Sequence, residues 1–149
     1  MAATVAHGSF TIGRTLQAPV EKVWAAFADP IAKKKWFKGP DDLAEEHTMD
    51  FRVGGSEHNS GVMHDGLKHR FEAHYYDIVP NERLIYTYEM YLDDRRISVS
   101  LATMEFQKQG TATYLQLTED GVFLDGLDAM ESRQRGTEEL FEALRRSVE

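Results

Sequence analysis

Four side chains near the middle of the sequence could do chemistry: His74, Tyr76, Tyr86 and Tyr88. An imidazole titrates near neutral pH, so His74 could transfer protons as a general acid or base. Aromatic rings with polar tips suit a cavity that binds small apolar molecules, although the same rings could fill a closed core. We favour ligand binding over catalysis, for which His74 is the one candidate.

These residues lie in a long run of alternating apolar and polar positions, which is typical of β-strands. Turn signals at Asp65-Gly66, Pro80-Asn81, Asp93-Asp94 and Gln109-Gly110 divide the run. The predicted strands are residues 9–16, 43–51, 56–63, 68–79, 83–91, 95–107 and 111–118. Their order along the chain predicts an antiparallel meander.

The turn at Asp93-Asp94 predicts the register of two neighbouring strands. A two-residue turn there places Tyr88 opposite Val99 and Tyr86 opposite Leu101. Because side chains alternate between faces, one face then collects the apolar positions and is the predicted core. That face consists of His74, Tyr76, Ile78, Leu84, Tyr86, Tyr88, Met90, Ile97, Val99, Leu101, Leu115 and Leu117.

The opposite face of the predicted sheet is mixed rather than polar. It carries the apolar residues Tyr75, Tyr91, Met104, Phe106 and Tyr114. A β-bulge could therefore switch the two faces part-way along the strands. If these side chains are exposed, two copies of the chain could pair through them, so a homodimer is a further hypothesis.

Residues 128–149 have the longest helical pattern in the chain. An apolar stripe recurs at spacings of three, four or seven, and Asp128 followed by Glu131 predicts an N-terminal capping box. The stripe consists of Met130, Thr137, Leu140, Phe141, Leu144 and Val148. Two shorter helices are predicted at residues 20–27 and 31–37. Since the long helix cannot bury its stripe alone, we expect an α+β fold with a curved antiparallel sheet closed over it.

The overall charge excludes several classes of partner. The chain has 25 acidic and 17 basic residues, and its net charge of -8 argues against nucleic acid or an anionic membrane. No apolar run reaches about 18 residues, so we expect no membrane insertion. Residues 1–14 lack the basic and apolar regions of a secretory signal, and a cytoplasmic protein is expected.

The histidine and cysteine content does not indicate a metal site. The chain has no cysteine, and His58, His64, His69 and His74 are not spaced as the helical pair of a zinc site. We expect no metal and no cofactor. Four lysines between positions 33 and 38 flank Trp36, where they could meet an acidic partner or an anionic head group. We favour a solvated helix face with Trp36 turned inward.

Several segments share the motifs of one known family. They are residues 18–24 (APVEKVW), 36–40 (WFKGP), 50–55 (DFRVGG), 65–66 (DG), 77–84 (DIVPNERL) and 110–117 (GTATYLQL). In order and spacing they resemble the family named after the activator of the Hsp90 ATPase, a branch of the START-like (SRPBCC) helix-grip superfamily. The resemblance runs from about Phe10 to Val148 and implies one helix-grip domain over residues 1–149.

The resemblance implies a function class rather than a specific ligand. Members of the wider superfamily bind lipids, hormones and polyketides, so we expect a small hydrophobic ligand between the sheet and the C-terminal helix. The family often has Gly-Trp in that helix, whereas Gly136-Thr137 here implies a larger cavity. The alternatives are contact with an Hsp90-type chaperone, although the chain has no room for the co-chaperone's N-terminal domain, and a polyketide-cyclase-like enzyme that uses His74.

The predicted site combines the inner face of the sheet with the helix stripe. The expected ligand-binding residues are Trp36, Met63, His74, Tyr76, Tyr86, Tyr88, Val99, Leu101, Leu117, Phe123, Met130, Thr137 and Phe141.

Overall fold

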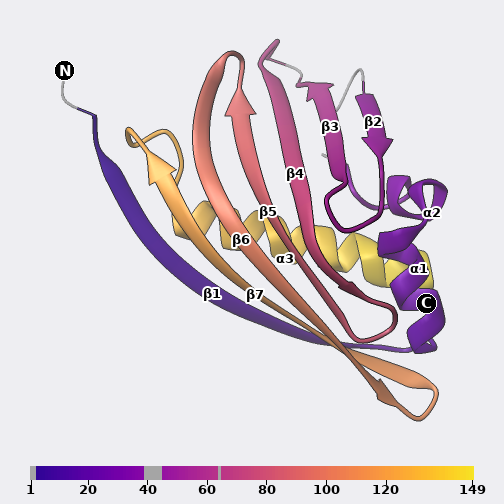
Figure 1. Ribbon diagram of the computed structural model, residues 1–149. Coiled ribbons are helices and arrows are strands. Elements are labelled where there is room, and N and C mark those ends of the chain that lie inside the picture. Colours follow the sequence, from indigo (N-terminus) through magenta and orange to yellow (C-terminus); the bar gives the residue numbers. More distant parts are fainter. Residues whose placement is uncertain (1–2, 39–44, 64) are drawn as a thin grey trace.

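A curved antiparallel sheet and one long helix dominate the computed structural model, which describes residues 3–38, 45–63 and 65–149 (Figure 1). The strands are β1 (Val5–Leu16), β2 (Glu45–Met49), β3 (Ser56–Val62), β4 (Lys68–Val79), β5 (Arg83–Leu92), β6 (Arg95–Gln109) and β7 (Ala112–Leu124). The helices are α1 (Val20–Ala28), α2 (Pro30–Lys34) and α3 (Met130–Val148). This is the predicted helix-grip architecture. The predictions for residues 39–44 and for His64 lie outside the described residues.

The sheet is a meander from β2 to β7, and the first strand of the chain, β1, pairs with β7 at one edge. Its order is β1-β7-β6-β5-β4-β3-β2, and every neighbouring pair is antiparallel. Short turns join β3 through β7, as the turn signals predicted. The two short helices form the connection between β1 and β2, and Figure 1 shows them at one end of the sheet.

The two short helices form a packed corner. The apolar stripe of α1 is buried, and the Asp29 carboxylate accepts a hydrogen bond from the Ile31 amide at the start of α2. Trp36 is buried as predicted, and its indole Nε1 donates to the Ala26 carbonyl oxygen at 2.9 Å. The prediction of a solvated lysine face was wrong for Lys33, because this side chain is buried.

Helix α3 crosses the concave side of the sheet (Figure 1). Its buried residues lie in its C-terminal half. Phe141, Leu144 and Val148 are buried there, and the helix packs on β1 and α1. The predicted stripe is therefore real. The predicted capping box was wrong, because Ala129 is the N-cap and the Asp128 carboxylate instead accepts a hydrogen bond from Arg133.

Two β-bulges correct the predicted register. Tyr75 pairs with Tyr86 and Asp77 with Ile85, so Tyr76 is the extra residue on β4. Ile97 is likewise extra on β6, since Met90 pairs with Ser98 and Tyr91 with Arg96. Each bulge shifts the pairing by one residue, and a one-residue shift moves every following side chain to the other face.

The four residues affected by these shifts lie on the outer face of the sheet, not beneath the helix. His74 is exposed, and the exposed fractions are 62% for Tyr76, 38% for Val99 and 40% for Leu101. In their place, Ser98, Ser100 and Ala102 of β6 face inward.

The predicted apolar patch on the second sheet face does not exist in the described structure. Tyr75, Met104 and Phe106 of that set are buried in the core. The homodimer stays a prediction, but it has lost the surface on which it was based. No helix among the described residues is both long and apolar enough to cross a bilayer.

Candidate ligand-binding cavity

A cavity of about 1060 Å³ lies between α3, α2 and the inner face of the sheet. Its aromatic and sulfur-containing lining includes Trp36, Phe37, Phe71, Tyr86, Met90 and Met104. Helix α3 contributes Gly136, Thr137 and Leu140. Helix α3 packs on β1 and α1, and its buried residues lie in its C-terminal half, whereas Ser132, Arg133, Gly136 and Thr137 of its earlier turns line the cavity.

Gly136 of α3 is exposed and lies at the cavity wall. A Cβ atom added at this position would meet no atom within 4 Å. The glycine therefore does not serve close packing of the helix on the sheet. The next residue, Thr137, also lines the cavity, and its hydroxyl donates back to the Arg133 carbonyl oxygen at 2.8 Å.

A polar network connects α3 to the sheet at the end of the cavity that lies near the start of α3. This end is called the far end below. The Tyr88 hydroxyl donates to Glu119 Oε2 at 2.6 Å, and Arg133 Nη1 donates to the Tyr88 hydroxyl oxygen at 3.0 Å. Arg133 Nη2 also donates to Ser98 Oγ at 2.8 Å and to Asp128 Oδ2 at 2.9 Å. All but Ser98 line the cavity. One guanidinium thus connects the start of α3 to two strands.

Burial controls the protonation of this network. It raises the pKa of the Glu119 carboxyl above its ordinary value, although Tyr88 and the charge of Arg133 oppose the shift. Burial and the nearby Glu119 charge also raise the pKa of the Tyr88 hydroxyl. Glu119 and Tyr88 are therefore groups that could hold a proton beside a bound molecule.

A second buried network closes the corner between α2 and the sheet. Glu57 Oε1 accepts hydrogen bonds from Lys33 Nζ, at 2.6 Å, and from the Tyr75 hydroxyl. Glu57 Oε2 lies 2.8 Å from His47 Nε2. Lys33 Nζ also lies 4.5 Å from the centre of the Phe37 ring. Both oxygens of Glu57 are thus occupied by neighbouring side chains.

The donors of this network keep Glu57 ionised. Burial alone would raise its pKa, but the charge of Lys33 and the hydrogen bonds from His47, Lys33 and Tyr75 lower it to about 2. Burial and the adjacent carboxylate raise the pKa of Tyr75. Only Lys33 of this group lines the cavity, so the cluster supports the cavity wall.

The structure brings seven of the thirteen predicted site residues together around the cavity. These are Trp36, Met63, Tyr86, Tyr88, Leu117, Thr137 and Phe141. Phe123 is buried with its ring 5.3 Å from the Arg133 guanidinium, and Met130 lies against Gly8 of β1. His74, Tyr76, Val99 and Leu101 were misplaced by the register shifts. Ligand binding by any of these residues stays a prediction.

Sequence reasoning named the lysines beside Trp36 but missed two other charged residues of the cavity wall, Glu119 and Arg133. Glu119 follows Leu115 and Leu117 at alternate positions of one strand, which signals an inward side chain, but the predicted strand ended at Thr118. Arg133 stands three residues after Met130 and four before Thr137, so it belongs to the inward stripe of α3. Periodicity therefore contained the signal for both.

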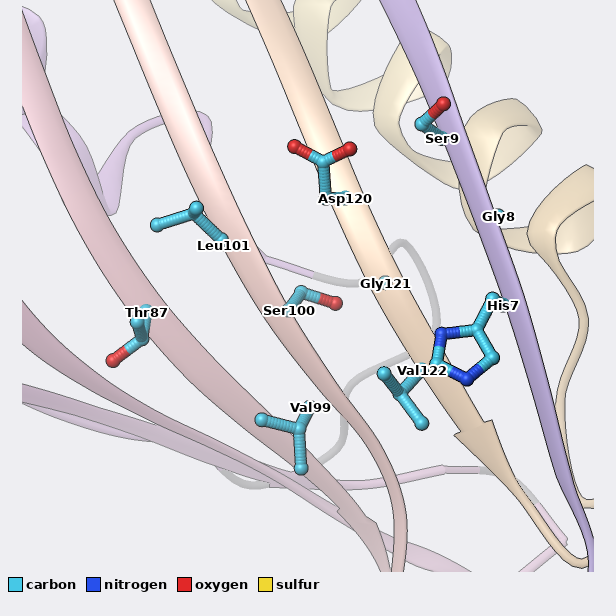
Figure 2. Close-up of a pocket in the computed structure, with 10 residues that line it drawn as sticks. All are labelled: His7, Gly8, Ser9, Thr87, Val99, Ser100, Leu101, Asp120, Gly121 and Val122. Atoms are coloured by element: carbon cyan, nitrogen blue, oxygen red, sulfur yellow. The ribbon is translucent and has the colours of Figure 1, made fainter.

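A second, shallower groove lies on the outer face of the sheet, with a volume of about 560 Å³. Figure 2 shows that it crosses β5, β6, β7 and β1, and that Val99 and Leu101 lie in it with His7, Asp120 and Val122. The two misplaced apolar residues thus line this groove and not the cavity.

The outer face also contains a serine, a histidine and a glutamate in a hydrogen-bonded row. His58 Nδ1 lies 2.5 Å from Glu72 Oε1, and His58 Nε2 lies 3.2 Å from Ser60 Oγ. This order matches the hydrogen bonds of hydrolase triads. None of the three residues lines the cavity or the outer groove.

Residues 17–149 match the family described as Activator of Hsp90 ATPase homolog 1-like protein. The chain belongs to this family. No curated protein matches the sequence. The match gives a family and a fold, and it names neither a ligand nor a reaction.

Solved structures reproduce the fold closely. A protein of Rhizobium leguminosarum is 40% identical, with a TM-score of 0.93 over 99% of this chain and 98% of its own. Mll3558 from Rhizobium loti is 38% identical, with a TM-score of 0.90 over 97% of this chain and 99% of its own. DynU16, from the dynemicin biosynthetic locus, shares only the fold. It is 19% identical, with a TM-score of 0.66 over 93% of this chain and 46% of its own.

Proposed function

We propose that the protein binds a small, mainly apolar molecule in the cavity between the sheet and α3. The Tyr86 hydroxyl carries this proposal. Tyr86 is buried and lines the cavity, yet its hydroxyl has no hydrogen-bond partner within the described residues. A buried polar group without a partner costs about 1–3 kcal/mol, so it implies a group in the cavity that pairs with it.

The rest of the lining fits the same proposal. The volume lies at the upper limit of small-molecule sites, which is about 1,000 Å³, and aromatic side chains form much of the wall. Met63, Met90 and Met104 are flexible and polarisable, so they can adapt to an irregular apolar surface. Tyr88 and Glu119 would orient a polar group at the far end, as specific ligand sites require.

The test uses N-phenylnaphthylamine, an uncharged dye that fluoresces in apolar surroundings. The dye should bind the purified protein, and Thr137→Trp should abolish the fluorescence rise because the indole occupies the cavity. Arg135→Trp is the matched control, since Arg135 is exposed on the same helix and does not line the cavity. Equal dye binding by both variants and the unaltered protein would contradict the proposal.

A polyketide-cyclase-like reaction is the second candidate. It is favoured by the Glu119–Tyr88 pair, because a carboxyl with a raised pKa beside a buried hydroxyl can exchange protons with a bound poly-β-ketone. His74 cannot serve this role from the outer face. Glu119→Gln should then abolish turnover of a poly-β-ketone thioester while leaving its binding intact. Unchanged turnover would eliminate the candidate.

A further inference from the structure

The charged side chains around the cavity are divided between its two ends. At the start of α3, Arg133 lies 2.9 Å from the Asp128 carboxylate and 3.9 Å from that of Glu119. This end therefore has one positive and two negative groups. The other end is lined by Lys35 and Lys38 after α2 and by Arg146 in the last turn of α3.

These three cations differ from the other basic residues of the cavity wall. Lys33 is neutralised by Glu57 at 2.6 Å, and Arg133 by its own carboxylates. Within residues 3–38, 45–63 and 65–149, none of Lys35, Lys38 and Arg146 takes part in an ion pair. All three are exposed, so water reaches this end of the cavity.

Among the described residues, few carboxylates oppose the three positive charges at this end, although Arg146 also interacts with Glu142 on the same helix. Glu139 lines the cavity two turns before Arg146 on the same helix, and it can offset one of them. The whole chain is acidic, with a net charge of -8, so a positive cluster here is not the result of a basic composition. Like charges around one opening repel each other, and an anion placed among them relieves that repulsion.

The surface beside this cluster is apolar. Trp36 and Phe37 lie between the two lysines in sequence, and Leu140, Phe141 and Ala143 face the same cavity from α3. Ser147 adds a hydroxyl next to Arg146. The arrangement thus combines positive hydrogen-bond donors at the opening with an aromatic and aliphatic interior.

We infer that the ligand is an amphiphile with an anionic head group, a carboxylate or a phosphate, bound with its head between Lys35, Lys38 and Arg146. Its apolar part lies along the aromatic interior and carries a hydrogen-bonding group that meets the Tyr86 hydroxyl. This inference rests on the proposed function, because it specifies what the same cavity binds. It gives the bound molecule a fixed direction in the cavity, which the fold alone does not require.

The first experiment compares four compounds with the same alkyl chain. Dodecanoate, dodecyl phosphate, dodecanol and dodecyltrimethylammonium displace bound N-phenylnaphthylamine in parallel titrations. Three exposed charge contacts predict at least about tenfold tighter binding of the two anions than of dodecanol, and a smaller advantage at high salt. The cation should bind most weakly. The better of the two anions identifies the head group.

Two results would overturn the inference in different ways. If dodecanol binds as tightly as dodecanoate, the cavity binds apolar chains without reading the charge, and the proposed function stands without the inference. If the dye itself does not bind, the proposed function fails together with the inference.

The second experiment moves the charge. The variant Lys35→Glu/Lys38→Glu/Arg146→Glu should lose the preference for dodecanoate over dodecanol, while its affinity for dodecanol is retained. Lys22→Glu/Lys34→Glu/Arg135→Glu changes the net charge equally at exposed positions that do not line the cavity. This control should keep the preference. An equal loss in both variants would assign the effect to net charge and overturn the inference.

Discussion

Glu57 and Glu119 are both almost completely buried, with exposed fractions of 1% and 2%, yet their pKa values shift in opposite directions. Glu57 receives hydrogen bonds or close contacts from three side chains, and one of these is the Lys33 ammonium group at 2.6 Å. Glu119 receives hydrogen bonds from Tyr88 and Ser100, and its nearest cation, Arg133, lies 3.9 Å away.

The comparison shows that burial alone does not decide the charge of a carboxylate. A close cation and several donors outweigh the loss of solvation at Glu57, whereas at Glu119 the loss of solvation dominates. Their positions differ accordingly. Glu57 joins α2 to the sheet outside the cavity, and Glu119 borders the space that we propose for a ligand.

The largest effect should come from neutralising Glu57, the carboxylate that has a close cation and several hydrogen-bond donors. Glu57→Gln leaves the buried Lys33 without its counter-ion, and removing one partner of such a pair costs about 3–5 kcal/mol of unfolding free energy. Urea denaturation measures the loss. Glu138→Gln is the control, because its ion pair with Arg14 at 3.5 Å is exposed and should contribute less than about 1 kcal/mol.

A double variant tests whether the unpaired lysine causes that loss. Lys33→Met/Glu57→Gln removes both charges, so it should recover much of the stability lost in Glu57→Gln. A double variant that is as unstable as the sum of its two single variants would show that the charges do not interact.

The next largest effect is a pH dependence. The pKa of Glu57 falls from 4.5 to about 2 on folding, a shift worth roughly 3 kcal/mol. Since the folded pKa is the lower one, this stabilisation is complete above 4.5 and is lost as the pH falls toward 2. The difference in unfolding free energy between the unaltered protein and Glu57→Gln should therefore shrink over this range in acid-titrated urea denaturation. A constant difference would contradict the shift.

Glu119→Gln should have a smaller effect of the opposite sign. The folded pKa of Glu119 lies above its ordinary value of 4.5, so its ionisation destabilises the folded state as the pH rises above 4.5. The amide can still accept from Tyr88, and the change at neutral pH should stay within about 1.5 kcal/mol, the value of one hydrogen bond. Relative to the unaltered protein, the variant should gain stability with rising pH. A falling trend in the same denaturation series would refute this.

The smallest expected effect concerns Gly136, which lines the same cavity as Glu119. Gly136→Ala improves helix propensity by up to about 1 kcal/mol, and the added methyl group meets no neighbour. The unfolding free energy of the variant should rise by roughly that amount, as measured by thermal or urea denaturation. A destabilised variant would show that α3 lies closer to the sheet than described.

The architecture could be predicted because each element has a strong local pattern. Alternation in residues 68–118 indicated the meander, and the stripe from Met130 to Val148 indicated the helix. The same patterns placed Tyr86, Tyr88, Leu117 and Thr137 at the cavity. These predictions needed only the period of each element and the side of it that is apolar.

The details that failed depend on contacts between distant segments. No residue type marks the bulges at Tyr76 and Ile97, and either side of a bulged strand is apolar enough to be a core face. Glu57 lies in a polar strand, and its partners Lys33, His47 and Tyr75 come from three separate parts of the chain. Their meeting follows from the tertiary fold and has no local signal.

The pairing of β1 with β7 affects how the chain can fold. The hairpins from β3 to β7 join neighbours in sequence, so they can form early and independently of the rest. Residues 5–16 can pair with residues 112–124 only after the latter have been synthesised. Helix α3 then packs on β1, the first strand to be synthesised. During synthesis on the ribosome, the inward face of β1 therefore stays without its partner until nearly the whole chain has been translated.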